Sequence, residues 1–226
     1  SFIQFYETKP DPTGSKIMNL RNGFSSVGEV IKNRGDIIWV EPYQNYFPEV
    51  DNEVYISCGF EIEFIYIEEW VRKRPDIKFI VGGPAVSYMN FSIDLPNVYF
   101  DNRYMFELLN ITPTSDMWSL KIPEAAKENK LYIYYTYPLT FGNSCYWGKC
   151  TICNRKTQLE IDLQIDKIPI LKPNRNIVWL NKLSITAKDI LIIFPTLSKE
   201  SFYSFFIRGD SVVLDALNKI QIVDTL

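Results

Sequence analysis

Short apolar runs alternate with a helical pattern in the first half of the chain. Residues 61–74 place Ile62, Ile65 and Trp70 at helical spacing, and Pro75 follows them. Strands separated by single helices predict right-handed βαβ units in a parallel sheet. We therefore expect residues 1–112 to form a doubly wound α/β domain, with strands at residues 36–40 (DIIWV), 54–58 (VYISC), 77–81 (IKFIV) and 97–100 (NVYF) and a second helix at residues 103–109.

The second half restarts the pattern after a polar stretch. Residues 113–130 contain two prolines and read as a linker with a short helix at residues 124–128. Residues 131–226 then predict a second α/β domain, with strands at residues 131–137 (LYIYYTY), 176–180 (NIVWL) and 202–207 (FYSFFI) and helices at residues 159–168, 184–194 and 211–220. In the last helix, Val212, Leu214, Leu217 and Ile220 are expected on one side.

Composition and charge narrow the classes of protein. The chain has 226 residues, of which 46% are hydrophobic, and this is a globular composition. A net charge of −3 gives no basic field for nucleic acid or an anionic membrane. No apolar run is long enough to span a bilayer, and no signal peptide is visible at the start of the sequence. We expect a cytoplasmic protein without a nucleic-acid or membrane partner.

The chain contains no histidine and four cysteines. The lack of an imidazole excludes Ser–His and Cys–His nucleophile pairs and histidine ligands for zinc or cobalt. The remaining chemistry depends on cysteine, carboxylate, lysine, tyrosine or a cofactor with its own reactivity.

Three of the cysteines, Cys145, Cys150 and Cys153, share the segment FGNSCYWGKCTICN directly after a predicted strand. Thiolates at this C-x4-C-x2-C spacing can reach one small metal centre. A structural zinc needs four ligands, and a fourth would have to be Cys58, an acid or a partner's residue. A [4Fe–4S] cluster bound by three thiolates leaves one iron open for a ligand. A disulfide with a spare thiol is the third alternative.

The segment SCYWGKCTICN resembles the cluster motif of the radical S-adenosylmethionine superfamily, with four residues rather than the usual three between its first two cysteines. The resemblance implies that Cys145, Cys150 and Cys153 hold a [4Fe–4S] cluster, whose open iron binds S-adenosylmethionine to generate a 5′-deoxyadenosyl radical. It implies that Ile152 packs near the adenine. It also implies further cofactor contacts from Asn181 and Arg208, which lie where the family's next two barrel strands end, although Asn181-Lys182 lacks the usual glycines and acid there.

The first half resembles the Rossmann-like, cobalamin-binding domain that precedes the barrel in part of this superfamily. The residues that carry this resemblance are Ser57, at a strand end, and Gly82 and Gly83, in the run IVGGP at the next strand end. The resemblance implies cobalamin as a further cofactor, bound without the histidine motif that many such domains use. Glycines at the carboxyl end of a strand let a ligand approach the backbone.

We expect a radical S-adenosylmethionine enzyme that modifies a peptide or natural-product precursor; no catalytic residue is assigned. Three strand–helix pairs follow Leu131, where the family's barrel usually has six, so we expect a partial (βα) barrel completed by a partner protein or a second copy. The alternative is a non-catalytic binding protein with a structural iron–sulfur or zinc site. We interpret Cys58 as a small buried residue and Glu61, Glu63, Glu68 and Glu69 as the solvated side of a helix.

Overall fold

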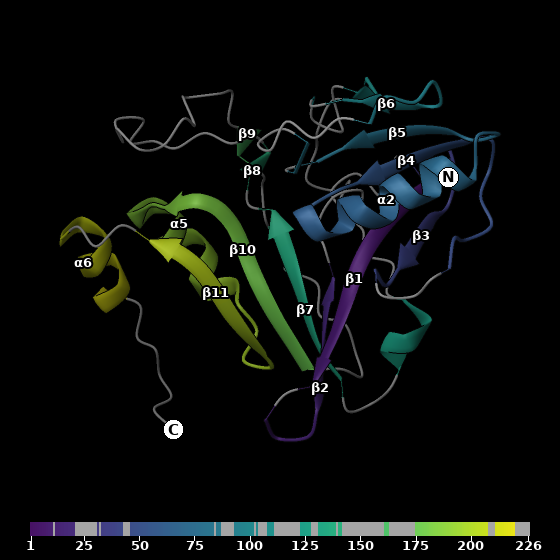
Figure 1. Cartoon of the computed structure of the whole chain (residues 1–226). Helices are drawn as coiled ribbons and strands as arrows, with labels where there is room; N and C mark the ends of the chain where they lie inside the picture. The colour runs from purple at the N-terminus through teal and green to yellow at the C-terminus, as the bar shows by residue number, and fades with distance from the viewer. Residues whose placement is uncertain are drawn as a thin grey trace. The chain divides into compact units, whose positions relative to one another are not determined.

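The computed structural model divides the chain into two compact units, Ser1–Ile133 and Tyr134–Leu226. Both units combine strands and helices, which confirms the expected α/β class (Figure 1). The structure describes residues 1–10, 12–20, 31, 33–42, 46–83, 85–86, 93–101, 103, 108–110, 123–127, 131–138, 140–141, 161–162, 175–207 and 211–219.

The first unit is built on a mostly parallel sheet. Its strands are β1 (Phe2–Pro10), β2 (Lys16–Leu20), β3 (Ile37–Val40), β4 (Glu53–Ser57), β5 (Lys78–Gly82) and β6 (Val98–Phe100). The hydrogen-bonded order is β2, β1, β4, β5, β6, and β3 also pairs with β1. All of these pairings are parallel except β1–β2, so the parallel strands run in the order β3–β1–β4–β5–β6. The four strands predicted for this half are all present.

The antiparallel β1–β2 hairpin lies in a region to which the sequence pattern assigns no element. Its turn contains Gly14, whose φ of +83° lies in the left-handed region that glycine tolerates. Gln4 and Glu7 are buried in β1 beside Ile3 and Phe5, so polar residues interrupt an otherwise apolar strand. This interruption hides the strand from a reading of hydrophobic periodicity.

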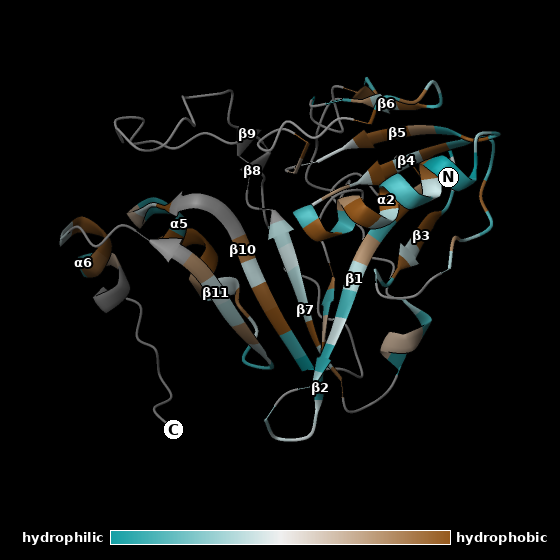
Figure 2. Ribbon diagram, viewed as in Figure 1, coloured by the Kyte–Doolittle hydropathy of each residue, from teal (hydrophilic) through white to brown (hydrophobic). Residues whose placement is uncertain are grey.

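Helix α2 (Glu61–Lys73) packs on the core of the first unit through Phe64, Ile67, Trp70 and Val71. The Trp70 ring stacks on Phe5 of β1, with 5.7 Å between centroids. The helix was predicted, but of the three residues at helical spacing only Trp70 is buried, whereas Ile65 is 64% exposed and Ile62 is also exposed. Because residues 61–71 are apolar around most of the helix, tertiary packing selects the side that is buried. Figure 2 shows the apolar strands β4 and β5 of this unit.

The carboxyl end of α2 is fastened by a side chain from the loop before β6. The Asn97 amide nitrogen Nδ2 lies within hydrogen-bonding distance of three backbone carbonyl oxygens, at 3.1 Å from Val71, 3.0 Å from Arg74 and 3.2 Å from Ile77. These carbonyls lie at and just beyond the end of the helix, where intrahelical donors run out. On the exposed side, Arg72 pairs with Glu68 and Lys73 with Glu69, as expected for a solvated helix surface.

The second unit contains the remaining strands and two helices. These elements are β7 (Leu131–Pro138), which crosses the division between the units, β8 (Thr140–Phe141), β9 (Ile161–Asp162), β10 (Arg175–Ile185), α5 (Ala187–Ile193), β11 (Ser201–Ile207) and α6 (Ser211–Lys219). β10 neighbours β7 and pairs in parallel with β11, as a βαβ unit through α5 requires. Two 3₁₀ turns complete the described elements, Glu124–Lys127 in the predicted linker and Phe194–Thr196 after α5.

Two predictions for the second half were wrong in part. Residues 161–162, expected inside a helix at 159–168, form strand β9 and pair with β8. In α6, Val212 and Leu214 are exposed, whereas Val213 and Ala216 are buried, so the helix turns a different side to the core than its larger residues indicate. Among the described residues, no helix combines the length and hydrophobicity needed to cross a membrane.

Candidate functional site

The predicted residues of the first half meet at the carboxyl ends of β4 and β5. Ser57 and Gly82 are register partners, and Ser57 is buried. The Cys58 amide donates to the Gly82 carbonyl at 2.8 Å, and the Ala85 amide donates to the Cys58 carbonyl at 3.2 Å. The structure therefore brings Ser57, Gly82 and Gly83 together at one edge of the sheet, where ligands of open α/β sheets bind.

The chain's own backbone lies against both glycines. A Cβ on Gly82 would lie 2.8 Å from the Asp101 carbonyl oxygen, and one on Gly83 would lie 2.5 Å from the Cys58 carbonyl oxygen. Gly83 also has φ +106°, which disfavours any other residue. Internal packing thus accounts for these glycines, and a ligand approaching them stays a prediction.

Glu63 was interpreted as solvated, and this was wrong. Its side chain is fully buried in the first turn of α2. The carboxylate oxygen Oε2 accepts hydrogen bonds from the Gly59 amide at 2.6 Å and the Phe60 amide at 3.3 Å. Two amides at the start of the helix, which have no intrahelical partner, are satisfied in this way. Glu63 is the third helical residue, the position of the acid in a capping box, but the preceding Gly-Phe pair lacks the Ser or Thr of that motif.

Cys58 lies beside this carboxylate and is buried, as the sequence interpretation expected. Burial, and secondly the charge of Glu63, raise the pKa of the Cys58 thiol to about 12. The thiol therefore stays protonated at neutral pH and donates weakly to the Phe60 carbonyl, with 3.5 Å between Sγ and oxygen. A protonated, buried thiol is neither a nucleophile nor a metal ligand.

The cysteine segment is flanked by two short strands that pair with each other. Thr140 of β8 is the register partner of Asp162 in β9, and Phe141 is the partner of Ile161. Cys145, Cys150, Cys153 and Ile152 lie between these strands and outside the described residues. The antiparallel pairing holds the two ends of the segment together. The next described residues after the cysteines, Ile161 and Asp162, form strand β9.

The predicted contacts in the second half have different outcomes. β10 runs to Ile185, so Asn181 lies inside the strand and not at its end. A register irregularity falls between Leu180 and Ile185. The strand end is followed by Thr186, whose hydroxyl accepts from the Asp189 amide at 3.2 Å and thereby caps α5. Arg208 lies outside the described residues.

Sequence reasoning did not identify the cavity at the opposite, amino-terminal end of the sheet in the first unit. This cavity of about 300 Å³ is lined by Ser1, Phe2, Arg34, Asp51, Glu53, Tyr55 and Leu109. Lys78 donates to Glu53 at 2.6 Å and holds the pKa of that carboxyl below its usual range. The Arg34 guanidinium donates to the Leu109 carbonyl at 2.9 Å. Glu53 and Arg34 in the cavity wall therefore already have protein partners.

The described residues contain no group of three or more Cys, Asp or Glu side chains arranged to hold a metal ion. Comparison with known proteins identifies no relative, because no protein-family model, no curated protein and no solved structure matches this chain.

Proposed function

We propose that the chain binds a [4Fe–4S] cluster through Cys145, Cys150 and Cys153 and is a radical S-adenosylmethionine enzyme acting on a peptide or natural-product precursor. The observation that carries the proposal is the placement of three thiols within residues 145–153, in a segment closed at its base by the β8–β9 pairing. Holding the ends together removes part of the entropy cost of gathering three ligands around one centre.

The donor set fits an iron–sulfur cluster better than zinc. All three local ligands are thiols, and the chain has no histidine to complete a tetrahedral zinc site. Cys58, the remaining cysteine, has a thiol pKa of about 12 and belongs to the other unit's core. Three thiolates leave one iron for S-adenosylmethionine, and the bound cluster would supply the electron that cleaves it to a 5′-deoxyadenosyl radical.

The strand order of the first unit supports the finer proposal of a Rossmann-like, cobalamin-binding-like domain. Numbered along the chain, the parallel strands β3–β1–β4–β5–β6 have the order 2-1-3-4-5 of a doubly wound sheet. In such sheets the ligand binds where the order reverses, here at the carboxyl ends of β1 and β4, and Ser57 lies at that end of β4. Cobalamin is the ligand proposed there. For the second unit, β10, α5 and β11 support the proposal of a partial (βα) barrel.

A test of catalysis distinguishes a radical S-adenosylmethionine enzyme from a protein that only binds an iron–sulfur cluster. Anaerobically reconstituted protein is reduced with dithionite in the presence of S-adenosylmethionine, and 5′-deoxyadenosine is measured by liquid chromatography. We expect 5′-deoxyadenosine from the wild type and none from Cys150→Ser. A wild-type protein with full iron content and no product would contradict the enzymatic proposal.

One observation favours a second candidate, a non-catalytic binding protein with a structural cluster or zinc. Asn181-Lys182 lies within β10, and the turn after the strand is occupied by the Thr186 cap of α5. The strand end where the superfamily binds the methionine amino group is thus used for internal hydrogen bonds. Metal analysis distinguishes the two forms of this candidate, because zinc without iron identifies the structural zinc site.

A further inference from the structure

The two sides of the second unit's strands differ in how well they are covered. Asn176, Val178 and Leu180 of β10 are buried, whereas Ile177 and Trp179 between them are only half-buried. A strand turns alternate side chains to opposite faces, so one face of β10 is covered and the other is partly open.

The covered face is the one against α5 and the turn that follows it. Phe205 of β11 contacts Phe194 of this turn edge to face, with 4.9 Å between centroids. The Tyr203 hydroxyl accepts from the Ser198 amide at 3.0 Å. On β7, Ile133, Tyr135 and Tyr137 are buried whereas Tyr134 and Thr136 between them are half-buried, so Tyr135 lies on the covered side of its strand.

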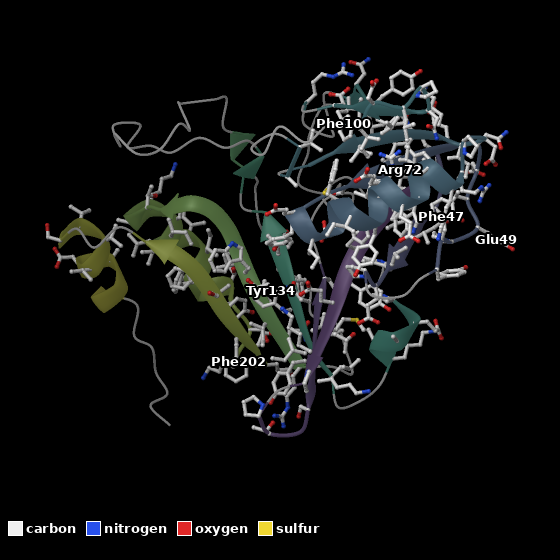
Figure 3. All side chains as sticks on the ribbon, in the orientation of Figure 1. Phe47, Glu49, Arg72, Phe100, Tyr134 and Phe202 are labelled. Atoms are coloured by element: carbon white, nitrogen blue, oxygen red, sulfur yellow. The ribbon has the colours of Figure 1, made fainter. Side chains whose placement is uncertain are left out.

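The opposite face, called the open face below, is aromatic and only partly covered: Phe202 is exposed and its other residues are half-buried. Phe202 is 65% exposed and is the register partner of Ile177, and Ser204 is the partner of Trp179. Tyr134 and Thr136 of β7 alternate with the buried Tyr135, so they lie on this face; Figure 3 labels Tyr134 and Phe202 on their strands. The open face is therefore formed by Tyr134, Thr136, Ile177, Trp179, Phe202 and Ser204.

The six residues of this surface are uncharged. β7 and β11 contain no Asp, Glu, Lys or Arg, and β10 contains none between Arg175 and Lys182. Phosphate-bearing ligands such as nucleic acids need cations, so these strands do not offer a site for them. Aromatic rings and hydroxyls favour an uncharged, apolar occupant that also forms hydrogen bonds.

Beside the open face lies a sheet edge along which no described strand pairs. Among the described strands, β11 pairs only with β10 and ends the hydrogen-bonded order. The strand at the other end of the order, β6, is less suited to pairing with an added strand. It has only three residues, and the charged Lys78 lies 5.5 Å from the ring centre of its Tyr99. β11 has seven residues and no charge, so its edge offers backbone hydrogen bonds for an added strand.

The geometry points to an extended, uncharged peptide segment that adds to the edge of β11 and places apolar side chains against Phe202 and Trp179. Strand addition supplies affinity through the backbone, and the open face supplies selectivity for side chains. The inference rests on the proposed function, because it describes how a peptide substrate of such an enzyme would be held. The residues that would bind the peptide lie on β10 and β11, outside the cysteine segment.

The test uses the full chain and a neutral probe, the peptide acetyl-TVFTVFT-amide with an uncharged dye, followed by fluorescence anisotropy. We expect saturable binding to the wild type and at least tenfold weaker binding to Phe202→Lys, because a desolvated aromatic anchor is replaced by a charge. The matched control is Leu214→Lys, an exposed apolar residue on α6, which should leave affinity within twofold. The peptide acetyl-TVFPVFT-amide, which cannot complete the ladder, should bind at least tenfold more weakly.

Three results would overturn the inference: no binding of the probe, equal binding to the wild type and Phe202→Lys, or a wild-type dimer by light scattering that Phe202→Lys dissociates. The last would identify a second copy as the occupant. Iron is measured on the same samples, before and after reconstitution. Protein that binds iron but not the probe refutes this inference alone, whereas probe binding without any iron uptake supports it and refutes the cluster.

Discussion

Substitution of Gly83 by alanine tests the packing at the carboxyl edge of the first unit. The new Cβ would lie 2.5 Å from the carbonyl oxygen, 3.0 Å from the nitrogen and 3.1 Å from the carbonyl carbon of Cys58. All three are backbone atoms, so no side chain can rotate away. The Cys58 backbone is also held by the Gly82 carbonyl and the Ala85 amide, so relief of the overlap weakens at least one hydrogen bond.

The magnitude follows from three contributions to the free energy of unfolding. A left-handed φ costs a non-glycine residue roughly 1–2 kcal/mol. Overpacking against fixed atoms costs about 1–3 kcal/mol, and a weakened buried hydrogen bond about 1 kcal/mol. We expect Gly83→Ala to lower stability by about 3–6 kcal/mol, or roughly 6–24 °C in Tm at 2–4 °C per kcal/mol.

Gly14→Ala is the matched control, because Gly14 has φ +83° but no atom within 4 Å of a Cβ built on it. It carries the backbone strain alone and should cost about 1 kcal/mol after the gain from a less flexible unfolded chain. Thermal unfolding followed by far-ultraviolet circular dichroism measures both variants. If Gly83→Ala melts at or above the temperature of Gly14→Ala, the close approach to Cys58 is refuted.

Three further outcomes follow from the same unit. Glu63→Ala should lower stability by about 2–3 kcal/mol in urea unfolding, because two helix amides lose their acceptor, whereas the exposed Glu61→Ala should change it by less than about 0.5 kcal/mol. Cys58 should resist iodoacetamide at pH 8 in the folded protein and react in urea, as read by mass spectrometry. The pKa of the Cys58 thiol is raised from 9.0 to about 12 by folding. The thiol therefore contributes fully to the free energy of unfolding below pH 9, and this contribution is lost as pH rises toward 12. Asn97→Asp should destabilise more than Asn97→Ala, because a carboxylate would face three carbonyl oxygens; differential scanning calorimetry compares the two.

Local patterns in the sequence were enough to predict the parallel strands and the helix starts. Residues 77–81 are apolar except for Lys78 and are followed by glycines, and β5 occupies nearly the same range. A helix was predicted at residues 184–194, and α5 begins just after Thr186, whose hydroxyl accepts from the Asp189 amide. These signals succeed because burial and capping act through residues close in sequence.

Features that depend on distant contacts could not be predicted in this way. Glu63 is buried because Gly59 and Phe60 turn their amides toward it, which its acidic neighbourhood in the sequence conceals. Val213 and Ala216, not the larger Leu214, face the core because of where α6 packs. The juxtaposition of Ser57 with Gly82 was predictable from parallel strand ends, but the Cys58 backbone lying against Gly83 was not.

Iron and acid-labile sulfide, measured per chain after anaerobic reconstitution, decide whether the three cysteines of residues 145–153 hold a [4Fe–4S] cluster. We expect about four irons and four sulfides in the wild type, with strong absorbance at roughly 400 nm. Serine at Cys145, Cys150 or Cys153 should abolish both, and Cys58→Ser, which removes a thiol of the buried core, should retain them. Protein without iron, or loss of iron in Cys58→Ser as complete as in Cys150→Ser, would contradict the proposed cluster.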